Sequence, residues 1–231
     1  MAKDPRMCYK DRRDFGTVLT TLVIGPLEQI FTVHEKLLCL NSSFFTSAVK
    51  NEWNSGQHHR IPLPDDIPLV ADLYIQWLYA NKIFSQQLPE EEGEEGKEFG
   101  LLVDGFLFGE KIQDGHFKNA LIDALIQSVR ALDLSGTPWR PIKRWVDQAY
   151  KGTTNGSPLR RLLVDLHAFR GESAWIKGSC NVDFLRYLAE RWVDNQDMPS
   201  KLDPTRTDLG SCFYDHHSKA NMCYQYLLDL A

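Results

Sequence analysis

The chain has 231 residues, which is enough for one large domain or for a domain with an appended helical region. Hydrophobic residues make up 43% and charged residues 25%, as in a globular protein, and no apolar run approaches the roughly 18 residues of a membrane span. The formal net charge of −5 disfavours nucleic acid as a partner, because neutralising phosphates requires an excess of lysine and arginine. The short pairs Arg12-Arg13 and Arg160-Arg161 are interpreted as solvated surface.

The N-terminus and the cysteines predict a cytoplasmic or nuclear protein. Residues 1–14 are polar and charged, lack the apolar core of a secretory signal, and are expected to form a flexible N-terminus. The five cysteines are scattered and odd in number, which indicates reduced thiols rather than a disulfide framework.

The first elements in chain order are a hairpin and a pair of helices. β-branched runs at residues 17–24 and 28–33 flank Gly25-Pro26 and predict two paired strands. Residues 35–49 have helical spacing, but Asn41-Ser42-Ser43 favours a cap over a helix interior and predicts a break there. The prolines of residues 60–64 restrict that short strand to a sheet edge or a strand end.

The following segments are predicted to be mainly helical. Residues 68–81 are predicted to form a helix with an apolar stripe made by Leu69, Leu73, Tyr74, Trp77 and Leu78. Residues 89–98 are rich in glutamate and predict a solvated loop. Helices are expected at residues 101–113 and 117–129, and the glycines of residues 105–111 are interpreted as sites of close helix packing.

A boundary is predicted near residues 134–138, where Gly136 and Pro138 interrupt the helical pattern. Beyond it, three amphipathic helices are expected around residues 142–150, 159–166 and 184–193, and Ser157-Pro158 is a suitable start for the second. Residues 195–231 are predicted to be a polar linker and tail.

The order of these elements and several local motifs resemble the BTB (POZ) family. Phe31, His34, Leu37-Leu38, Ser42 and Phe44-Phe45 match the family signature F-x-x-H-x-x-L-L-x-x-x-S-x-F-F. Ile61-Pro62-Leu63-Pro64-Asp65-Asp66 resembles its short strand, and Trp77-Leu78-Tyr79 is also typical of it. Residues 156–165 are similar to a segment of BTB proteins abundant in filamentous fungi. Glu35 departs from the basic residue that often follows the histidine, which puts the partner surface in doubt.

The resemblance implies an α+β chain: a BTB/POZ domain over residues 15–133, with a small mixed sheet and a cluster of helices, then an all-helical region over residues 134–194. It also implies a homodimer that binds other proteins as an adaptor or scaffold, with a cullin-type ubiquitin ligase as one partner to consider. A BTB-containing transcriptional or chromatin regulator is the alternative, and a metal-dependent enzyme is a third hypothesis.

No catalytic residue or cofactor is expected from the motifs. His34-Glu35 begins like a zinc-protease motif but lacks the second histidine, so the ring of His34 is expected to bond neighbouring backbone. Cys39 and Cys180 are interpreted as inert thiols.

A cluster near the C-terminus has zinc-ligand residue types: Cys212, His216, His217 and Cys223. Adjacent histidines rarely point the same way, so the preferred interpretation is an unligated tail and no metal site is assigned.

Overall fold

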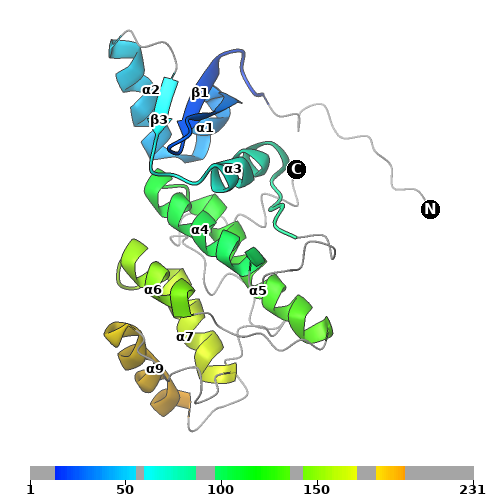
Figure 1. The fold of residues 1–231 in the computed structure, drawn as a ribbon, viewed down its shortest axis with the longest axis vertical. Coiled ribbons are helices and arrows are strands. Elements are labelled where there is room, and N and C mark those ends of the chain that lie inside the picture. Colours follow the sequence, from blue (N-terminus) through cyan, green and yellow to red (C-terminus); the bar gives the residue numbers. More distant parts are fainter. Residues whose placement is uncertain (1–13, 56–59, 87–96, 136–142, 171–180, 196–231) are drawn as a thin grey trace, which may run out of the picture.

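The computed structural model describes residues 14–55, 60–86, 97–135, 143–170 and 181–195. Within these ranges the chain is an α+β protein with one small sheet and mostly helices, as the sequence predicts. Figure 1 shows the sheet at one end, the longest helices in the middle and three shorter helices at the other end. None of the helices in the described ranges is long and apolar enough to cross a membrane.

The sheet has three strands, β1 (Leu19–Ile24), β2 (Gln29–His34) and β3 (Arg60–Leu63). Their order is β2-β1-β3, with β1 antiparallel to β2 and parallel to β3, so the sheet is mixed and β3 lies at an edge as predicted. Gly25 has a φ of +72°, a left-handed conformation that glycine adopts without strain. Its N–H donates to the Leu63 carbonyl at 2.9 Å, which ties the hairpin turn to β3.

The predicted helix break is confirmed: α1 (Glu35–Asn41) ends at Ser42 and α2 (Ser43–Ser55) begins after it. The Ser42 hydroxyl accepts a hydrogen bond from the Phe45 N–H at 3.1 Å and donates one to the Ile112 carbonyl at 2.5 Å. The buried Ser42 side chain therefore caps α2 and also joins it to Ile112, which lies 70 residues further along the chain.

The central helices are α3 (Pro68–Ala80), α4 (Lys97–Ile112) and α5 (Gly115–Ser135). The stripe predicted for α3 is wrong at Leu69, which is 61% exposed, because the helix turns Val70 and Ala71 inward instead. Asp114 lies at the α4–α5 turn, where its carboxylate accepts hydrogen bonds from the Phe117 N–H at 2.9 Å and the Tyr74 hydroxyl at 3.1 Å. A buried carboxylate thus starts α5 and ties it to α3.

Glycines on α4 allow close helix packing, as predicted from the sequence. A Cβ on Gly109 would lie 2.7 Å from Lys118 Cγ on α5, and a Cβ on Gly105 would lie 3.3 Å from Leu121. Gly100, which the prediction did not include, is tighter still, because its Cβ would lie 2.3 Å from the Trp145 ring.

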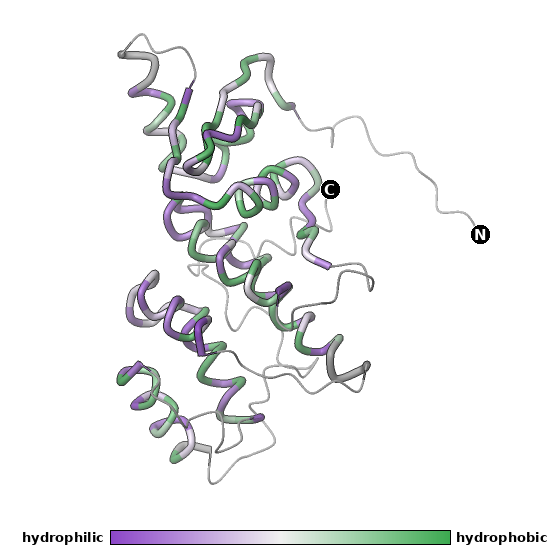
Figure 2. The backbone as a smooth tube through the Cα atoms, viewed as in Figure 1, coloured by the Kyte–Doolittle hydropathy of each residue, from purple (hydrophilic) through white to green (hydrophobic). Residues whose placement is uncertain are grey.

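Three further helices follow, α6 (Lys143–Gly152), α7 (Pro158–Arg170) and α9 (Val182–Asn195). Trp145 of α6 and Leu159 and Leu162 of α7 belong to the same apolar cluster as Leu102 of α4. A second cluster joins α6, α7 and α9 through Val146, Tyr150, Val164, Phe184 and Leu188. Hydrophilic and hydrophobic residues are interspersed along these helices (Figure 2), so each has an apolar side to bury.

The packing of α6 on α4 predicts that Gly100→Ala destabilises the protein by about 1–3 kcal/mol, the usual effect of overpacking a filled core. Gly115→Ala is the matched control, since nothing lies within 4 Å of a Cβ there. It should be neutral or stabilising by up to about 1 kcal/mol, because alanine restricts the unfolded chain. Urea unfolding followed by circular dichroism measures both, and equal effects would contradict the packing described.

A second prediction concerns pH. Burial lowers the pKa of His167 below its ordinary value of 6.5, and Nδ1 lies 2.7 Å from the Leu163 carbonyl oxygen. The unfolded chain binds this proton at a higher pH than the folded chain does, so the free energy of unfolding should fall as pH decreases below about 6.5. His167→Gln should make that decrease shallower when urea unfolding is measured between about pH 7.5 and 5.

Burial raises the pKa of Asp104 and of Asp114 above the ordinary carboxyl value, and these groups act in the opposite direction. The difference between wild type and His167→Gln isolates the histidine, because both proteins keep the two aspartates. Identical pH dependence in the two proteins would contradict the assignment to His167.

Candidate protein-binding surface

The residues that carry the BTB-like signature lie inside the protein. Leu38 and Phe45 are fully buried, and Leu37 is 6% exposed. Phe31 and Phe44 are partly buried and pack against the same core. The signature therefore builds the hairpin and the helix pair and does not itself form a binding surface.

His34 joins the end of the hairpin to α3 through a side chain. Its Nδ1 lies 2.7 Å from the Tyr79 hydroxyl, and its backbone N–H donates to the same oxygen at 3.2 Å. The Phe15 ring lies beside both, with centroid distances of 5.6 Å to His34 and 5.7 Å to Tyr79. The expectation that the ring bonds neighbouring backbone is therefore wrong, because the phenol of Tyr79, 45 residues away, occupies Nδ1.

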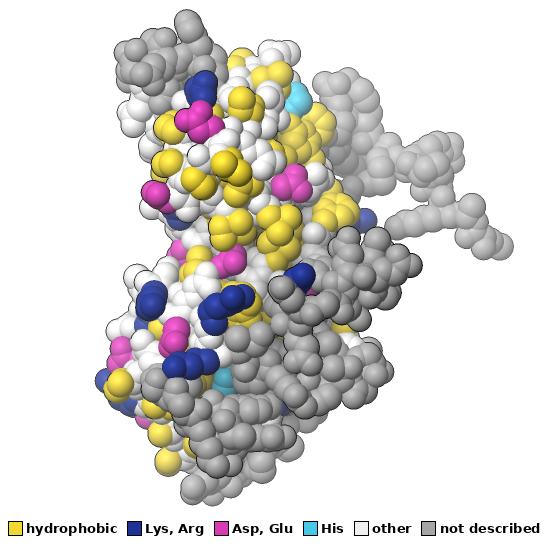
Figure 3. All heavy atoms as spheres, viewed as in Figure 1, with side chains coloured by type: hydrophobic (Ala, Val, Ile, Leu, Met, Phe, Trp, Pro, Cys, Tyr) yellow, Lys and Arg dark blue, Asp and Glu magenta, His cyan; other side chains and the backbone are white. Residues whose placement is uncertain are grey.

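Large exposed apolar side chains gather on the N-terminal half of the described chain. We call the following set the N-terminal apolar surface: Val18, Leu19, Leu27, Ile30, Leu40, Ile67, Leu69 and Phe84. Figure 3 shows hydrophobic side chains spread over this half on the face in view, whereas lysine and arginine are concentrated lower down. Exposed apolar side chains that gather on one part of a protein are common at protein-interaction sites.

The strand register explains why the hairpin contributes to this surface. Side chains alternate across a strand, so Leu22 and Ile24 enter the core while Leu19, on the opposite face, is 49% exposed. Ile30 pairs with Val23 on that same outer face and is 62% exposed. β2 is also an edge strand in the described sheet, so its outer backbone groups are a template for pairing with another chain.

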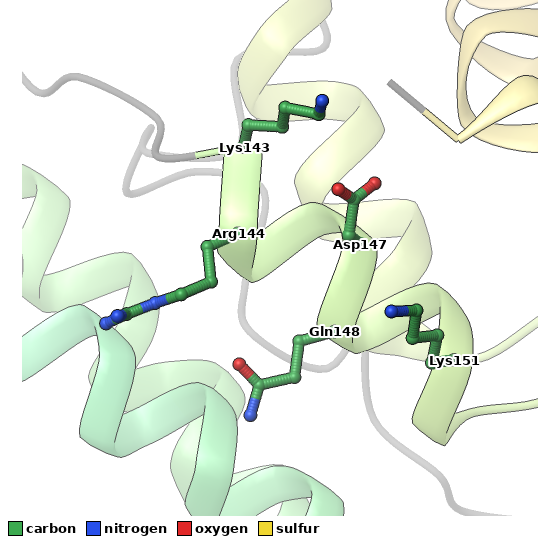
Figure 4. Close-up of a pocket in the computed structure, with 5 residues that line it drawn as sticks. All are labelled: Lys143, Arg144, Asp147, Gln148 and Lys151. Carbon is green, nitrogen blue, oxygen red and sulfur yellow. The ribbon is translucent and has the colours of Figure 1, made fainter. Parts of the chain in front are cut away.

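A hollow of about 460 Å³ lies along α6 and is lined by Lys143, Arg144, Asp147, Gln148 and Lys151. Figure 4 shows Arg144 and Gln148 directed toward the neighbouring helix, with Lys143 and Asp147 pointing away from it. Gln148 donates a hydrogen bond to Asp104 of α4. All five side chains come from one helix and diverge, so they do not converge on a ligand.

A different hollow of about 400 Å³ lies between α7 and the helices on either side of it, and Arg160 and Arg161 line it. The interpretation of this pair as solvated surface is wrong for Arg160, which is only 8% exposed. Its guanidinium turns back along the chain and bonds the end of α6, including the Tyr150 carbonyl at 2.8 Å. Sequence patterns do not predict this difference, because two adjacent arginines look alike until the helix orientation is known.

Within the described residues, no group of three or more His, Cys, Asp or Glu side chains is positioned to hold a metal ion. Cys212, His216, His217 and Cys223 lie outside the described residues, as do Cys180 and residues 89–96 of the predicted glutamate-rich loop. The loop prediction is wrong at residues 97 and 98, which form the first turn of α4. Cys39 is a partly buried free thiol, and burial raises its pKa, which disfavours the reactive thiolate.

No protein-family model matches this sequence, and the comparison with curated proteins found no match.

The His34–Tyr79 contact predicts that Tyr79→Phe lowers the free energy of unfolding by about 1–3 kcal/mol, because two hydrogen bonds to the phenol are lost. Tyr150→Phe is the matched control, since the Tyr150 hydroxyl is buried with no hydrogen-bond partner in the described structure. It should leave the stability unchanged or slightly higher. Thermal melts of both variants measure the difference, and a larger loss in Tyr150→Phe would contradict the assignment.

Proposed function

We propose that this chain is a protein-interaction adaptor or scaffold that acts as a homodimer through a BTB-like domain at residues 15–133. The observation that carries the proposal is the N-terminal apolar surface beside the open edge of β2. An exposed apolar surface and an open strand edge promote aggregation unless a partner covers them.

The arrangement of elements supports the BTB-like part of the proposal. The described chain runs through a hairpin, a helix pair, an edge strand and then helices, which is the order that the resemblance implies. The signature residues occupy positions where they hold these elements together, with Phe45 and Leu38 buried and Ser42 capping α2. The helices α6, α7 and α9 extend this unit and offer a second, more polar surface.

The proposed dimer is two-fold symmetric, so every apolar side chain in the interface contributes twice. Burying a leucine or isoleucine side chain stabilises by about 1.5–3 kcal/mol. Because Leu19, Leu27 and Ile30 are 49%, 92% and 62% exposed, their burial in two copies would contribute about 6–12 kcal/mol, which is comparable with the association entropy of about 4–15 kcal/mol. A dimer is therefore within reach of the hairpin residues alone, and Val18 would add to it.

An adaptor is favoured over an enzyme because the buried Asp114, His167 and Asp165 have structural roles. Asp114 starts α5, His167 bonds its own helix and Asp165 pairs with Arg191 at 2.5 Å. We place the adaptor in the cytoplasm or nucleus and propose other proteins as its partners, with a cullin as the first to test.

The test of the dimer is light scattering on the full chain at tens of micromolar. We expect a mass of twice the 26.6 kDa of one chain, and Ile30→Lys should shift it to the single-chain mass. Val193→Lys is the matched control, because Val193 is equally exposed (66% against 62%) but lies on α9 at the far end of the molecule.

A monomeric wild type at that concentration would contradict the proposed dimer, as would equal effects of the two variants. The adaptor role is tested on the same samples by adding a purified cullin N-terminal region and measuring co-elution. Retention on DNA at moderate salt, with no binding to cullin, would instead favour the transcriptional alternative.

A further inference from the structure

The outer edge of β2 presents a row of backbone groups that the described sheet leaves unpaired. β2 lies at one end of the order β2-β1-β3, so only one of its sides faces β1. The Glu35 N–H, one residue past the strand, donates to the Val18 carbonyl just before β1 at 3.0 Å. Bonded and unbonded residues alternate along an antiparallel pair, so the odd-numbered residues of β2 bond to β1 in this register. The backbone groups of Ile30 and Thr32 therefore point outward.

The contacts of His34 agree with this register and mark where the open row ends. Its N–H, which also points away from β1, donates to the Tyr79 hydroxyl at 3.2 Å. The open row is thus made by the N–H and carbonyl groups of Ile30 and Thr32, and no hydrogen bond to them is formed within the described residues.

The side chains of β2 do not protect this edge. Edge strands are commonly kept from pairing by charged side chains, proline or short length. β3, at the opposite edge, has only four residues, and Arg60 and Pro62 are two of them. β2 has six residues, Gln29–His34, and they include no proline, lysine, arginine, aspartate or glutamate. Its central residues are β-branched or aromatic, which favours strand pairing.

A second copy of the chain has groups that match this row. In a two-fold antiparallel pair, Ile30 of one copy can lie opposite Thr32 of the other, and the symmetry repeats the pair. Each such pair exchanges two hydrogen bonds, so every open group of the row is satisfied in both copies. The two-fold axis then passes beside Phe31. No like charges are brought together, because the strand has no Asp, Glu, Lys or Arg.

The same register adds side-chain contacts on both faces of the sheet. Phe31 is partly buried against the core and would face its own counterpart across the axis, at the close spacing of an unbonded pair. On the outer face, Ile30 is 62% exposed and would lie against the exposed Thr32 of the other copy. Because Ile30 also belongs to the N-terminal apolar surface, strand pairing and apolar burial occur in one interface.

We propose that the two copies of the dimer join edge to edge through β2, with Ile30 of each copy opposite Thr32 of the other, so that their sheets become continuous. This inference rests on the proposed dimer and specifies its geometry. It differs from association by apolar packing alone, because the interface depends on the outward N–H groups of β2 as well as on its side chains.

The first test removes one outward N–H. Thr32→Pro deletes this donor but keeps the bonds between β1 and β2, because the Thr32 N–H does not face β1. Light scattering over a dilution series of the full chain should give a dimer dissociation constant roughly tenfold higher or more, since symmetry removes two hydrogen bonds. Thr32→Ala is the matched control, because it keeps the N–H and should retain the dimer. Circular dichroism checks that both variants are folded.

Amide hydrogen exchange, measured by NMR, tests the same row without a substitution at Thr32. In the wild-type dimer the amides of Ile30 and Thr32 should exchange slowly, as those of Phe31 and Val33 do. In the Ile30→Lys variant, which is expected to be a single chain, the Thr32 amide should exchange fast. The amides of Phe31 and Val33 should stay slow there, because β1 still protects them.

The outcomes separate this pairing from the dimer on which it rests. A folded Thr32→Pro that loses the dimer while Thr32→Ala keeps it, together with a slow Thr32 amide in wild type, supports the pairing. A wild-type dimer would overturn the pairing, but not the proposed dimer, if Thr32→Pro leaves it intact, if both substitutions weaken it equally, or if its Thr32 amide exchanges as fast as in Ile30→Lys. A monomeric wild type would overturn both, and the open edge would then suit an extended segment of a different protein.

Discussion

The burial of α4 on several sides is the constraint on which the rest of the structure depends. Leu102 and Phe106 are fully buried, and the helix contacts α2, α3, α5 and α6. Because neighbouring helices surround α4, some of its positions have no room for a side chain. Gly100 packs against the Trp145 ring, and Gly109 packs against Lys118. Helices that approach this closely fix one another's orientation, because interiors are close-packed and do not deform continuously. The sheet is thus linked to α4 through α2 and α3, and α7 is linked to it through α6.

This arrangement places two chemically different surfaces at opposite ends of one body. The end with the sheet exposes leucine, isoleucine and valine, whereas the hollow at the other end is lined mainly by arginine, tyrosine and carboxylates. Apolar surface is suited to permanent association, since its burial is non-directional and roughly proportional to area. Arginine and tyrosine are suited to selective recognition, since their hydrogen bonds require a ligand of matching geometry. α4 joins the first of these ends to the second.

The sequence predicted those features that depend on neighbouring residues. The hairpin, the break at Ser42 and the edge position of β3 follow from turn and cap chemistry within a few residues, and all are observed. The prediction that Leu69 is buried was wrong, because it depends on which side of α3 faces the core. The prediction for the partner of His34 was wrong, because that partner is a tyrosine 45 residues away. The hollow was missed for the same reason: Tyr150 appears only as one member of an apolar stripe, and Arg160 as half of a basic pair. Local signals cannot tell which polar atoms remain unpaired after packing.

Buried polar groups provide the argument that the C-terminal helices do more than enlarge the core. In the sheet-bearing part, Ser42 and Asp114 have several partners each and connect separate elements. Near α7, by contrast, the Tyr150 and Ser157 hydroxyls have no partner in the described structure and Arg160 meets only neutral oxygens. Replacing the two hydroxyl groups by apolar ones of similar shape would be neutral or stabilising, so packing alone does not account for them. Arg160, by contrast, has a structural role, because its guanidinium bonds the carbonyl groups at the end of α6.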